Sequence, residues 1–346
     1  MLFIILSISL LFARNHIFQA FIEKETQQEI DALIQEGKKY IKVYEENNKE
    51  AQDQLLTVTT MVNTLNQLRD SIGKEDWRQT VTIENNYLMQ LKTYKELGGE
   101  FTVSTQEMDN KLALNQKLLD ENIPPEHETY SKALPNFMKQ VVDIYITFGA
   151  IIILLFLIGN ILSSEFKNRS IQFLYTQPIK KTSIVSSKLW SALIVYIVLT
   201  FIAFTTVCII GLIFGETGSF YYPIVIEQHN TFTFITITEY MLYAMAVTSA
   251  TIFLMLALSL LVSLVVKRTV ASMIVLIGIL VGGYALFTYI NQPDIAWYNP
   301  FQYVIPQNTI LLQNTSLWYQ GIPIVIGLGI VCYLLSIIKM KFTRVA

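Results

Sequence analysis

The stretch EFKNRSIQFLYTQPIKKTSIVSSK, residues 165–188, lies between two long apolar runs and decides how the chain is arranged. It carries five basic side chains, at Lys167, Arg169, Lys180, Lys181 and Lys188. Basic residues between two membrane spans mark the cytoplasmic side, because Lys and Arg resist translocation. Pro178 interrupts an otherwise helical pattern of apolar and polar residues, so we expect one or two short amphipathic helices at the inner membrane surface. A basic loop that only sets the topology is the alternative.

Six apolar segments surround this loop. They cover about residues 1–20, 144–162, 189–214, 240–266, 270–290 and 322–338. The first is apolar only as far as Ala13, so it either continues to about residue 20 or lacks residues before Met1. The inner connections and the tail hold ten basic residues, whereas the outer loops 216–238 and 291–320 hold no Lys or Arg. The positive-inside rule therefore predicts a multi-pass protein of the cell membrane with six spans and both termini in the cytoplasm.

Within the basic loop, an acidic residue and Phe precede Ser-Ile, a Leu, a Pro and two Lys. These residues are Glu165, Phe166, Ser170, Ile171, Leu174, Pro178, Lys181 and Lys188. In this order the stretch resembles the cytoplasmic loop of permease subunits of ABC-2 type ABC transporters. It departs from that family's pattern in having Arg169 in place of Gly and Ser170 in place of Thr.

This resemblance implies a coupling helix in residues 164–188 that sits on a separately encoded ABC ATP-binding subunit. ATP and Mg would be held by that partner, so no cofactor is expected in this chain. The resemblance also implies a second permease, as a homodimer or a heterodimer. A weaker likeness to Gram-positive ABC-2 permeases rests on Trp77-Arg78 and on Asn122-Ile123-Pro124-Pro125.

Residues 21–138 form the extended hydrophilic region. Thirteen positions in residues 30–72, spaced alternately by four and three, include ten apolar residues, which favours a long helix with coiled-coil-like packing. Unbroken, it would reach roughly 60 Å, with bends expected at Gly37 and Asn48. A second helix is predicted over about residues 74–97, and a third begins at the capping box of Ser104 and Glu107.

The predicted fold is therefore an all-α polytopic membrane protein. Residues 1–20 form the first span, residues 21–138 a helical extracellular domain, and residues 139–346 a five-helix transmembrane domain. That domain includes loop 164–188 and a re-entrant-like outer loop, 291–320. An interfacial belt of aromatic side chains explains the outer loop equally well.

Charge and composition support this division. Only 15% of the 346 residues are charged, against about 25% in soluble domains. Residues 14–139 carry 15 basic and 21 acidic side chains, and the remainder carries 10 basic and 6 acidic ones. An acidic water-exposed domain joined to a basic-flanked membrane domain explains the difference, and it argues against nucleic acid as a partner.

The sequence offers no catalytic or metal-binding set. It lacks the phosphate-binding pattern G-x-x-x-x-G-K-[ST], and its spans lack paired carboxylates of the kind that ion-coupled transporters use near the midplane. Hydroxyl side chains in the spans either line a weakly polar path or bond to their own backbone. Gly278 and Gly282 form a GxxxG pair, which predicts a close helix contact.

Together these features predict the permease subunit of an ATP-driven transporter, which contacts membrane lipid and is not itself an enzyme. Export of a hydrophobic or amphipathic substrate such as a peptide, lipid or drug is expected. The alternative is a non-transporting membrane sensor or adhesion protein whose external helical domain binds a ligand.

Overall fold

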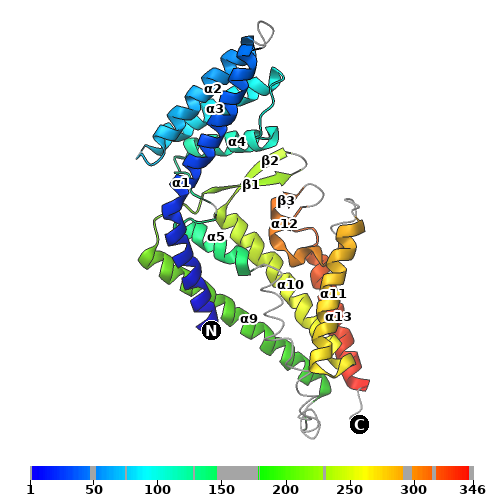
Figure 1. Ribbon diagram of the computed structural model, residues 1–346. Helices are drawn as coiled ribbons and strands as arrows, with labels where there is room; N and C mark the ends of the chain where they lie inside the picture. The colour runs from blue at the N-terminus through cyan, green and yellow to red at the C-terminus, as the bar shows by residue number, and fades with distance from the viewer. Residues whose placement is uncertain are drawn as a thin grey trace. The chain divides into compact units, whose positions relative to one another are not determined.

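The computed structural model describes residues 2–46, 52–74, 76–127, 129–145, 178, 180–228, 231–290, 298–313 and 317–342. Most of this part is helical, as predicted (Figure 1). In chain order the elements are α1 (Leu2–Glu46), α2 (Gln52–Ser71), α3 (Trp77–Glu96), α4 (Thr105–Glu121), α5 (Leu134–Tyr145), α9 (Lys181–Phe214), β1 (Pro223–Gln228), β2 (Thr231–Thr236), α10 (Ile237–Val266), α11 (Thr269–Ile290), the 3-10 helix η2 (Gln302–Val304), α12 (Pro306–Leu311), β3 (Leu312–Gln313) and α13 (Ile322–Phe342).

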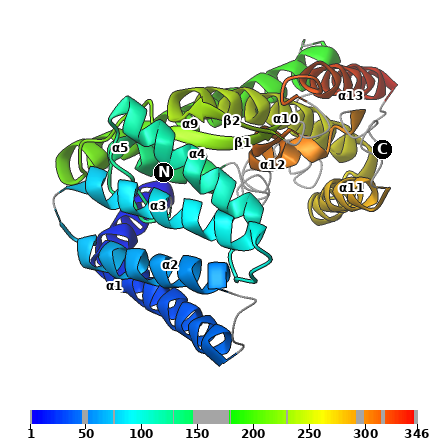
Figure 2. The same cartoon turned by 90° about the horizontal axis from the view of Figure 1, so that it is seen from above.

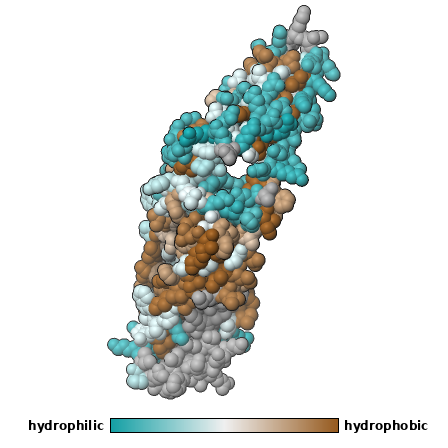
Figure 3. Space-filling model, turned by 90° about the vertical axis from the view of Figure 1, so that its left-hand side faces the viewer, coloured by the Kyte–Doolittle hydropathy of each residue, from teal (hydrophilic) through white to brown (hydrophobic). Residues whose placement is uncertain are grey.

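The chain divides into two compact units. The helical unit comprises Ser9–Phe137 and Phe214–Val225, and the apolar unit comprises Met1–Ile8, Met138–Ile213 and Ile226–Ala346. In Figure 3 the surface over α2, α3 and α4 is mainly hydrophilic, whereas the surface over the long helices of the apolar unit is mainly hydrophobic. The helical unit therefore has a surface suited to water, and the apolar unit has one suited to lipid.

The apolar seam of residues 30–72 folds into two helices instead of one long helix. α1 continues as a helix through Gly37 and ends at Glu46, and α2 begins at Gln52. The helix thus does not end at Gly37, the bend expected there stays a prediction, and Asn48 lies outside the described residues. A Cβ atom at Gly37 would lie 2.5 Å from Val62 Cγ2. Glycine is needed here because it allows α1 and α2 to approach closely, not because the helix ends.

The core of the helical unit joins α1, α2, α3 and α4, which lie side by side in Figures 1 and 2. Its buried members are Ile30, Ile34, Val58, Met61, Val62, Leu65, Leu68, Tyr87, Leu88, Leu91, Tyr94, Phe101 and Met108. Fully burying one such side chain contributes about 1.5–3 kcal/mol. The helical spacing in the sequence thus marks the face of each helix that is buried.

Capping residues set the ends of α3 and α4 close to the predicted positions. The Asp76 side chain accepts a hydrogen bond from the Gln79 N–H, and Gly98 lies at a φ of +81° just after α3. At α4, Ser104 accepts from the Glu107 N–H while the Glu107 carboxylate accepts from the Ser104 N–H. Both second and third helices are confirmed, because side chains and backbone satisfy the groups that a helix end leaves open.

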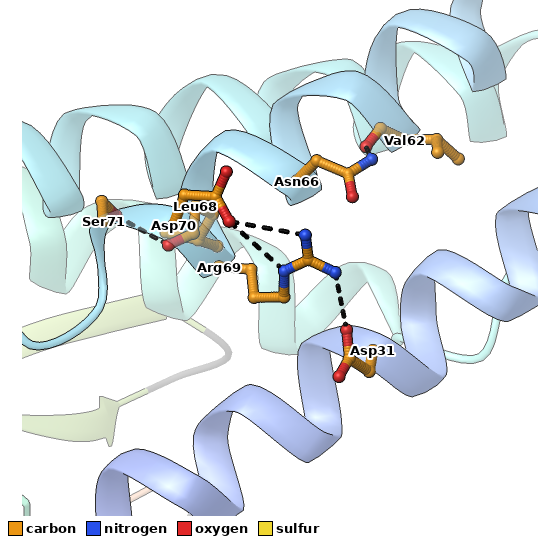
Figure 4. A network of polar contacts seen from close by, with 7 residues as sticks. All are labelled: Asp31, Val62, Asn66, Leu68, Arg69, Asp70 and Ser71. Atoms are coloured by element: carbon orange, nitrogen blue, oxygen red, sulfur yellow. Dashed lines mark hydrogen bonds and ion pairs between the residues drawn. The ribbon is translucent and has the colours of Figure 1, made fainter.

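An arginine joins α1 and α2 at the surface (Figure 4). Arg69 Nη1 lies 3.2 Å from Asp31 Oδ1 on α1, and Arg69 Nη2 lies 3.4 Å from Asp70 Oδ1. The side chain of Ser71 donates to the carbonyl of Leu68 at 2.7 Å and closes the last turn of α2. Because the ion pair is exposed, it adds little to stability but fixes the pairing of the two helices.

A polar layer lies between α3 and α4. Asn115 Nδ2 donates to Asn85 Oδ1 and to Glu84 Oε2, both at 2.9 Å, and Lys111 Nζ lies 2.7 Å from Glu84 Oε1. Asn85 and Asn115 are buried. Buried amides that satisfy each other specify how two helices align, because a shifted register would leave them unpaired.

Four described helices are long and apolar enough to cross a membrane. They lie at Leu2–Gln19, Lys181–Phe214, Ile237–Val266 and Ile322–Phe342. They coincide with the first, third, fourth and sixth predicted spans. α11 corresponds to the fifth predicted span. Its apolar portion, Thr269–Ala285, is shorter than the four helices above. The second predicted span lies almost entirely outside the described residues.

α10 is the central helix of the apolar unit. Within its most apolar window, 67% of the residues are buried, against 17% for α9 and 22% for α13. α10 packs along α13 and α11, and its side chains Ile252, Met255 and Leu256 belong to the main buried cluster. α9 and α13 expose much of their apolar surface, as lipid-facing helices do.

A small sheet departs from the all-α prediction. Its strand order is β2-β1-β3, with β1 and β3 parallel and Glu227 opposite Leu312. The sheet joins the two outer loops 216–238 and 291–320, which lie far apart in the sequence. The segment TFTFIT of β2 alternates β-branched and aromatic residues, which favours a strand. Strand pairing across two separate loops could not be expected from either loop alone.

Candidate coupling and helix-contact sites

The predicted coupling residues fall largely outside the described part of the chain. The residues concerned are Glu165, Phe166, Ser170, Ile171 and Leu174. Pro178 is described and exposed, and α9 begins three residues later at Lys181. The structure therefore describes only the end of the loop that enters α9.

The start of α9 is anchored in the core of the apolar unit. Ile184, Val185 and Leu189 are at most 5% exposed and pack with side chains of α10, α11 and α13. The hydroxyl oxygens of Ser186 and Tyr333 lie 2.7 Å apart and join α9 to α13. A displacement of the loop end would therefore reach three other helices through packed side chains.

Lys181 and Lys188 lie on the same side of α9 as Ile184, since positions three and seven apart share one helix face. Both lysines are partly buried, whereas Ile184 is buried. The two predicted coupling lysines therefore border the face of α9 that the chain's own core uses.

Most hydroxyl groups of the spans bond to their own helix. Thr200 donates to Tyr196 O at 2.9 Å, and Thr206 donates to Ile202 O at 2.8 Å. The same i−3 or i−4 pattern holds for Thr205, Thr251 and Ser259. These contacts confirm the backbone-bonding alternative for these five side chains.

The GxxxG pair of α11 makes no close contact within the described chain. Among the described residues, no atom comes within 4 Å of a Cβ built at Gly278 or Gly282. Close approach occurs instead at Gly283, which lies against Phe301, and at Gly329 of α13, which lies against Phe253 and the Leu254 backbone. A helix contact through Gly278 and Gly282 thus stays a prediction, because no described residue supplies it.

The outer loop is folded against α10 over residues 298–313. Thr251 Oγ1 donates to the carbonyl of Tyr303 at 3.0 Å, and Tyr303 is 1% exposed. This loop contains the 3-10 helix η2 and the short helix α12, with Pro306 at the first position of α12. Tyr298 is exposed. Tyr303 is thus covered by protein, whereas an aromatic side chain of an interfacial belt would be exposed.

Residues 1–338 match the family model for the ABC-2 family transporter protein. The chain belongs to the ABC-2 transporter family. No curated protein and no solved structure matches it. With four described apolar helices, this chain of the ABC-2 family is a multi-pass membrane protein and a transporter permease.

In this ABC-2 permease the two motifs of the weaker likeness contact each other. Arg78 Nε donates to Asn122 Oδ1 at 3.1 Å, and the Arg78 guanidinium lies 5.6 Å from the Trp77 ring centroid. Asn122 ends α4 with a φ of 57°, a left-handed conformation that Asn tolerates. These residues therefore brace the start of α3 against the end of α4.

The helical unit of the permease contains a cluster of tyrosines, of which Tyr87 and Tyr94 are buried and Tyr40 and Tyr44 are partly buried. The hydroxyl oxygens of Tyr44 and Tyr94 lie 2.8 Å apart, and Tyr40 packs beside both. Burial raises the pKa of Tyr40, Tyr87 and Tyr94, and the Glu36 carboxylate raises these pKa values further. The phenols therefore stay neutral at physiological pH and act in packing, not as bases.

A buried charged pair was missed by the hydropathy pattern, which begins the second span at residue 144. Lys139 and Asp143 lie on α5 with side chains 10% and 19% exposed. They contact Tyr240, which is fully buried at the start of α10. The available signal was the four-residue spacing of Lys and Asp, which places both on one helix face.

Proposed function

We propose that this chain is the permease subunit of an ATP-driven ABC transporter whose ATP-binding subunit is encoded separately. The observation that carries the proposal is the family match over residues 1–338, joined to a sequence without a phosphate-binding loop. A transporter that cannot bind ATP by that route needs a surface on which a partner acts. Loop 164–188 supplies that surface, with Glu165, Phe166, Ile171 and Leu174 as contact residues.

In this proposal the six spans place both termini and the coupling loop in the cytoplasm. The helical unit then lies outside the cell, in the connection between the first and second spans. The charge distribution supports this sidedness, because the outer loops 216–238 and 291–320 contain no Lys or Arg. The hydrophilic surface of α2, α3 and α4 supports a position in water.

Closure of two ATP-binding subunits would push on the coupling loops. The push would enter α9, whose residues Ile184, Val185 and Leu189 pack against α10, α11 and α13. Because packed side chains transmit displacement between rigid helices, the loop movement would shift the spans between inward and outward states. Mg and ATP act on the partner subunit, and this chain supplies the mechanical connection.

The proposed substrate class rests on the scarcity of available polar groups in the described spans. Their hydroxyl groups bond largely to their own helices, so they offer few polar groups to a passing molecule. A hydrophobic or amphipathic peptide, lipid or drug fits such spans better than an ion does. We propose export as the direction. A second permease would complete the path, with the open face of Gly278 and Gly282 as a contact.

Co-purification with hydrolysis measurements tests the proposal. The intact chain should pull down a partner that carries a phosphate-binding loop and should stimulate its ATP hydrolysis. Replacing Glu165→Ala or Ile171→Ala/Leu174→Ala should reduce that stimulation at least tenfold, with expression unchanged. Glu227→Gln, an acidic residue in β1 of the opposite loop, is the matched control and should keep full stimulation.

Failure of any ATP-hydrolysing partner to bind would favour the membrane sensor or adhesion protein instead. In that case the external helical unit would bind a ligand, and loop 164–188 would only set the topology. Loss of stimulation in Glu227→Gln as well as in Glu165→Ala would also count against a specific coupling loop.

A further inference from the structure

α5 buries a polar face where the membrane part begins. Lys139 and Gln140 are 8% and 7% exposed, and Asp143 follows one turn later. A buried ion pair is weak evidence for stability, since apolar residues of similar volume often serve as well or better. Stability alone therefore does not account for this pair.

Lys139 and Asp143 both contact Tyr240 of α10. Lys139 Nζ lies 3.3 Å from Asp143 Oδ2 and 5.5 Å from the ring centroid of Tyr240. The hydroxyl of Tyr240 donates to Asp143 Oδ1. Tyr240 is fully buried, so its ring and its hydroxyl are both held by side chains from α5.

This arrangement can be released without stranding a charge. Lys139 and Asp143 are four residues apart on one helix, so their ion pair persists when α10 moves away. Separation then exposes two charges that remain paired and can be hydrated. An ion pair formed between the two helices would instead leave a lone charge on each. Opening breaks the hydrogen bond between Tyr240 and Asp143 and the ring interaction between Tyr240 and Lys139.

α5 leads directly into the predicted second span, residues 144–162, whose inner end begins loop 164–188. We propose that Lys139, Asp143 and Tyr240 form an outer latch between α5 and α10, closed in this structure and opened during the transport cycle. The opening force rests on the proposed function, because the partner subunit would drive loop 164–188. The contacts among Lys139, Asp143 and Tyr240 are observed in the structure and do not depend on the proposed function.

Cysteine labelling of the full-length chain tests the latch. Cys208→Ser and Cys332→Ala first remove the two free thiols. Met241→Cys places a reporter at a buried position beside Tyr240, and Thr238→Cys places a reference at an exposed position of the same helix start. The rate of reaction with a maleimide is measured for each reporter in the purified protein.

Tyr240→Phe removes the hydroxyl that reaches Asp143 and keeps the ring. Since hydrogen bonds to charged groups are the stronger ones, labelling of Met241→Cys should rise about tenfold or more. Tyr243→Phe makes the same chemical change three residues on, where the ring stacks on Trp318, and it should change neither reporter. The charge-free variant Lys139→Met/Asp143→Leu should raise Met241→Cys labelling as Tyr240→Phe does, while the melting temperature is retained.

Two results would overturn the latch. Labelling of Met241→Cys could stay unchanged in Tyr240→Phe, which would make the cluster a static packing feature. Alternatively, both reporters could rise together, which would show that the start of α10 unfolds instead of separating from α5.

The complex with the ATP-binding subunit separates this inference from the proposed function. Trapping nucleotide on the partner should raise Met241→Cys labelling severalfold when the latch residues are intact. Stimulated hydrolysis without any change in labelling would overturn the latch and leave the proposed function standing. Absence of stimulated hydrolysis would count against the proposed function, and the nucleotide-free comparison of Tyr240→Phe with Tyr243→Phe would still decide the latch.

Discussion

In the helical unit, apolar residues recur every three or four positions, and the side chains so spaced are the ones that are buried. In the apolar unit, α9, α10 and α13 are apolar on every side, yet α10 is mostly buried and α9 mostly exposed. Water distinguishes an apolar face from a polar one, so a soluble helix must bury its apolar face. Lipid makes no such distinction. Contacts between membrane helices are therefore determined by small residues and by how closely the side chains of two helices pack.

The largest expected effect on stability comes from a substitution in the core of the helical unit. Leu91→Ala removes a fully buried side chain of α3 and should destabilise this unit by about 2–5 kcal/mol. Met89→Ala, two residues away and 55% exposed, should change stability by less than about 0.5 kcal/mol. Hydrogen exchange of the α3 amides in the full chain measures both. Equal effects would mean that the spacing does not mark the buried face.

The next largest effect on stability is expected where helices pack closely in the apolar unit. A Cβ at Gly329 would lie 2.8 Å from the Phe253 ring and 3.3 Å from Leu254 Cα, whereas one at Gly327 meets no described atom within 4 Å. Gly329→Ala should cost about 1–3 kcal/mol through overpacking, and Gly327→Ala should be neutral. Thermal unfolding of the purified chain in detergent compares them. A larger loss at Gly327 would contradict the packing of α13 on α10.

A smaller effect comes from the cap of α4. Ser104→Ala should cost about 1 kcal/mol, because the Glu107 N–H loses its acceptor. Circular dichroism during chemical unfolding measures this loss, with Thr105→Ala, a position outside the cap pair, as the control.

The same cap predicts a pH dependence. The backbone N–H and the hydroxyl of Ser104 hold the pKa of the Glu107 carboxyl below its ordinary value. A lowered folded-state pKa gives stability that is present above the ordinary carboxyl pKa and is lost as the pH falls through the lowered value. Ser104→Ala should flatten this acid dependence, and an unchanged acid limb would contradict the role of the cap.

The smallest effect is expected for the exposed ion pair between α1 and α2. Arg69→Gln removes the contact with Asp31 and should cost at most about 1 kcal/mol. The difference from the unaltered chain should shrink further at high salt, because salt screens exposed charges. Urea unfolding at low and high salt measures it. A loss as large as that of Leu91→Ala would show that charge, not apolar spacing, holds this hairpin.

Local patterns predicted the helical unit well. The Ser104–Glu107 capping box, the end of α3 before Gly98 and the apolar seam all appear where local chemistry placed them. The seam could not reveal that α1 and α2 are two helices, because an apolar stripe looks alike whether it packs on another helix or on its own continuation. The close approach of Val62 to Gly37 could not be predicted either, because the sequence does not show which glycine of a helix has a neighbouring helix against it.

In the apolar unit, prediction reached the spans but not their contacts. Gly278 and Gly282 have the spacing of a helix contact, yet Gly283 and Gly329 make the close approaches. The pairing of β1 with β3 joins residues some 85 positions apart, Glu227 and Leu312, and no local pattern encodes a partner at that distance.

The sequence by itself determined that this chain has a hydrophilic helical part and several apolar helices, and that a basic loop joins two of them. Hydropathy, capping and charge are local properties, so they can be read residue by residue. Only the tertiary structure decided that α10 is the central helix, that Tyr303 is covered by protein, and that Lys139, Asp143 and Tyr240 meet. Such contacts depend on the fit between distant surfaces, and in a uniformly apolar helix every face satisfies the same local rule.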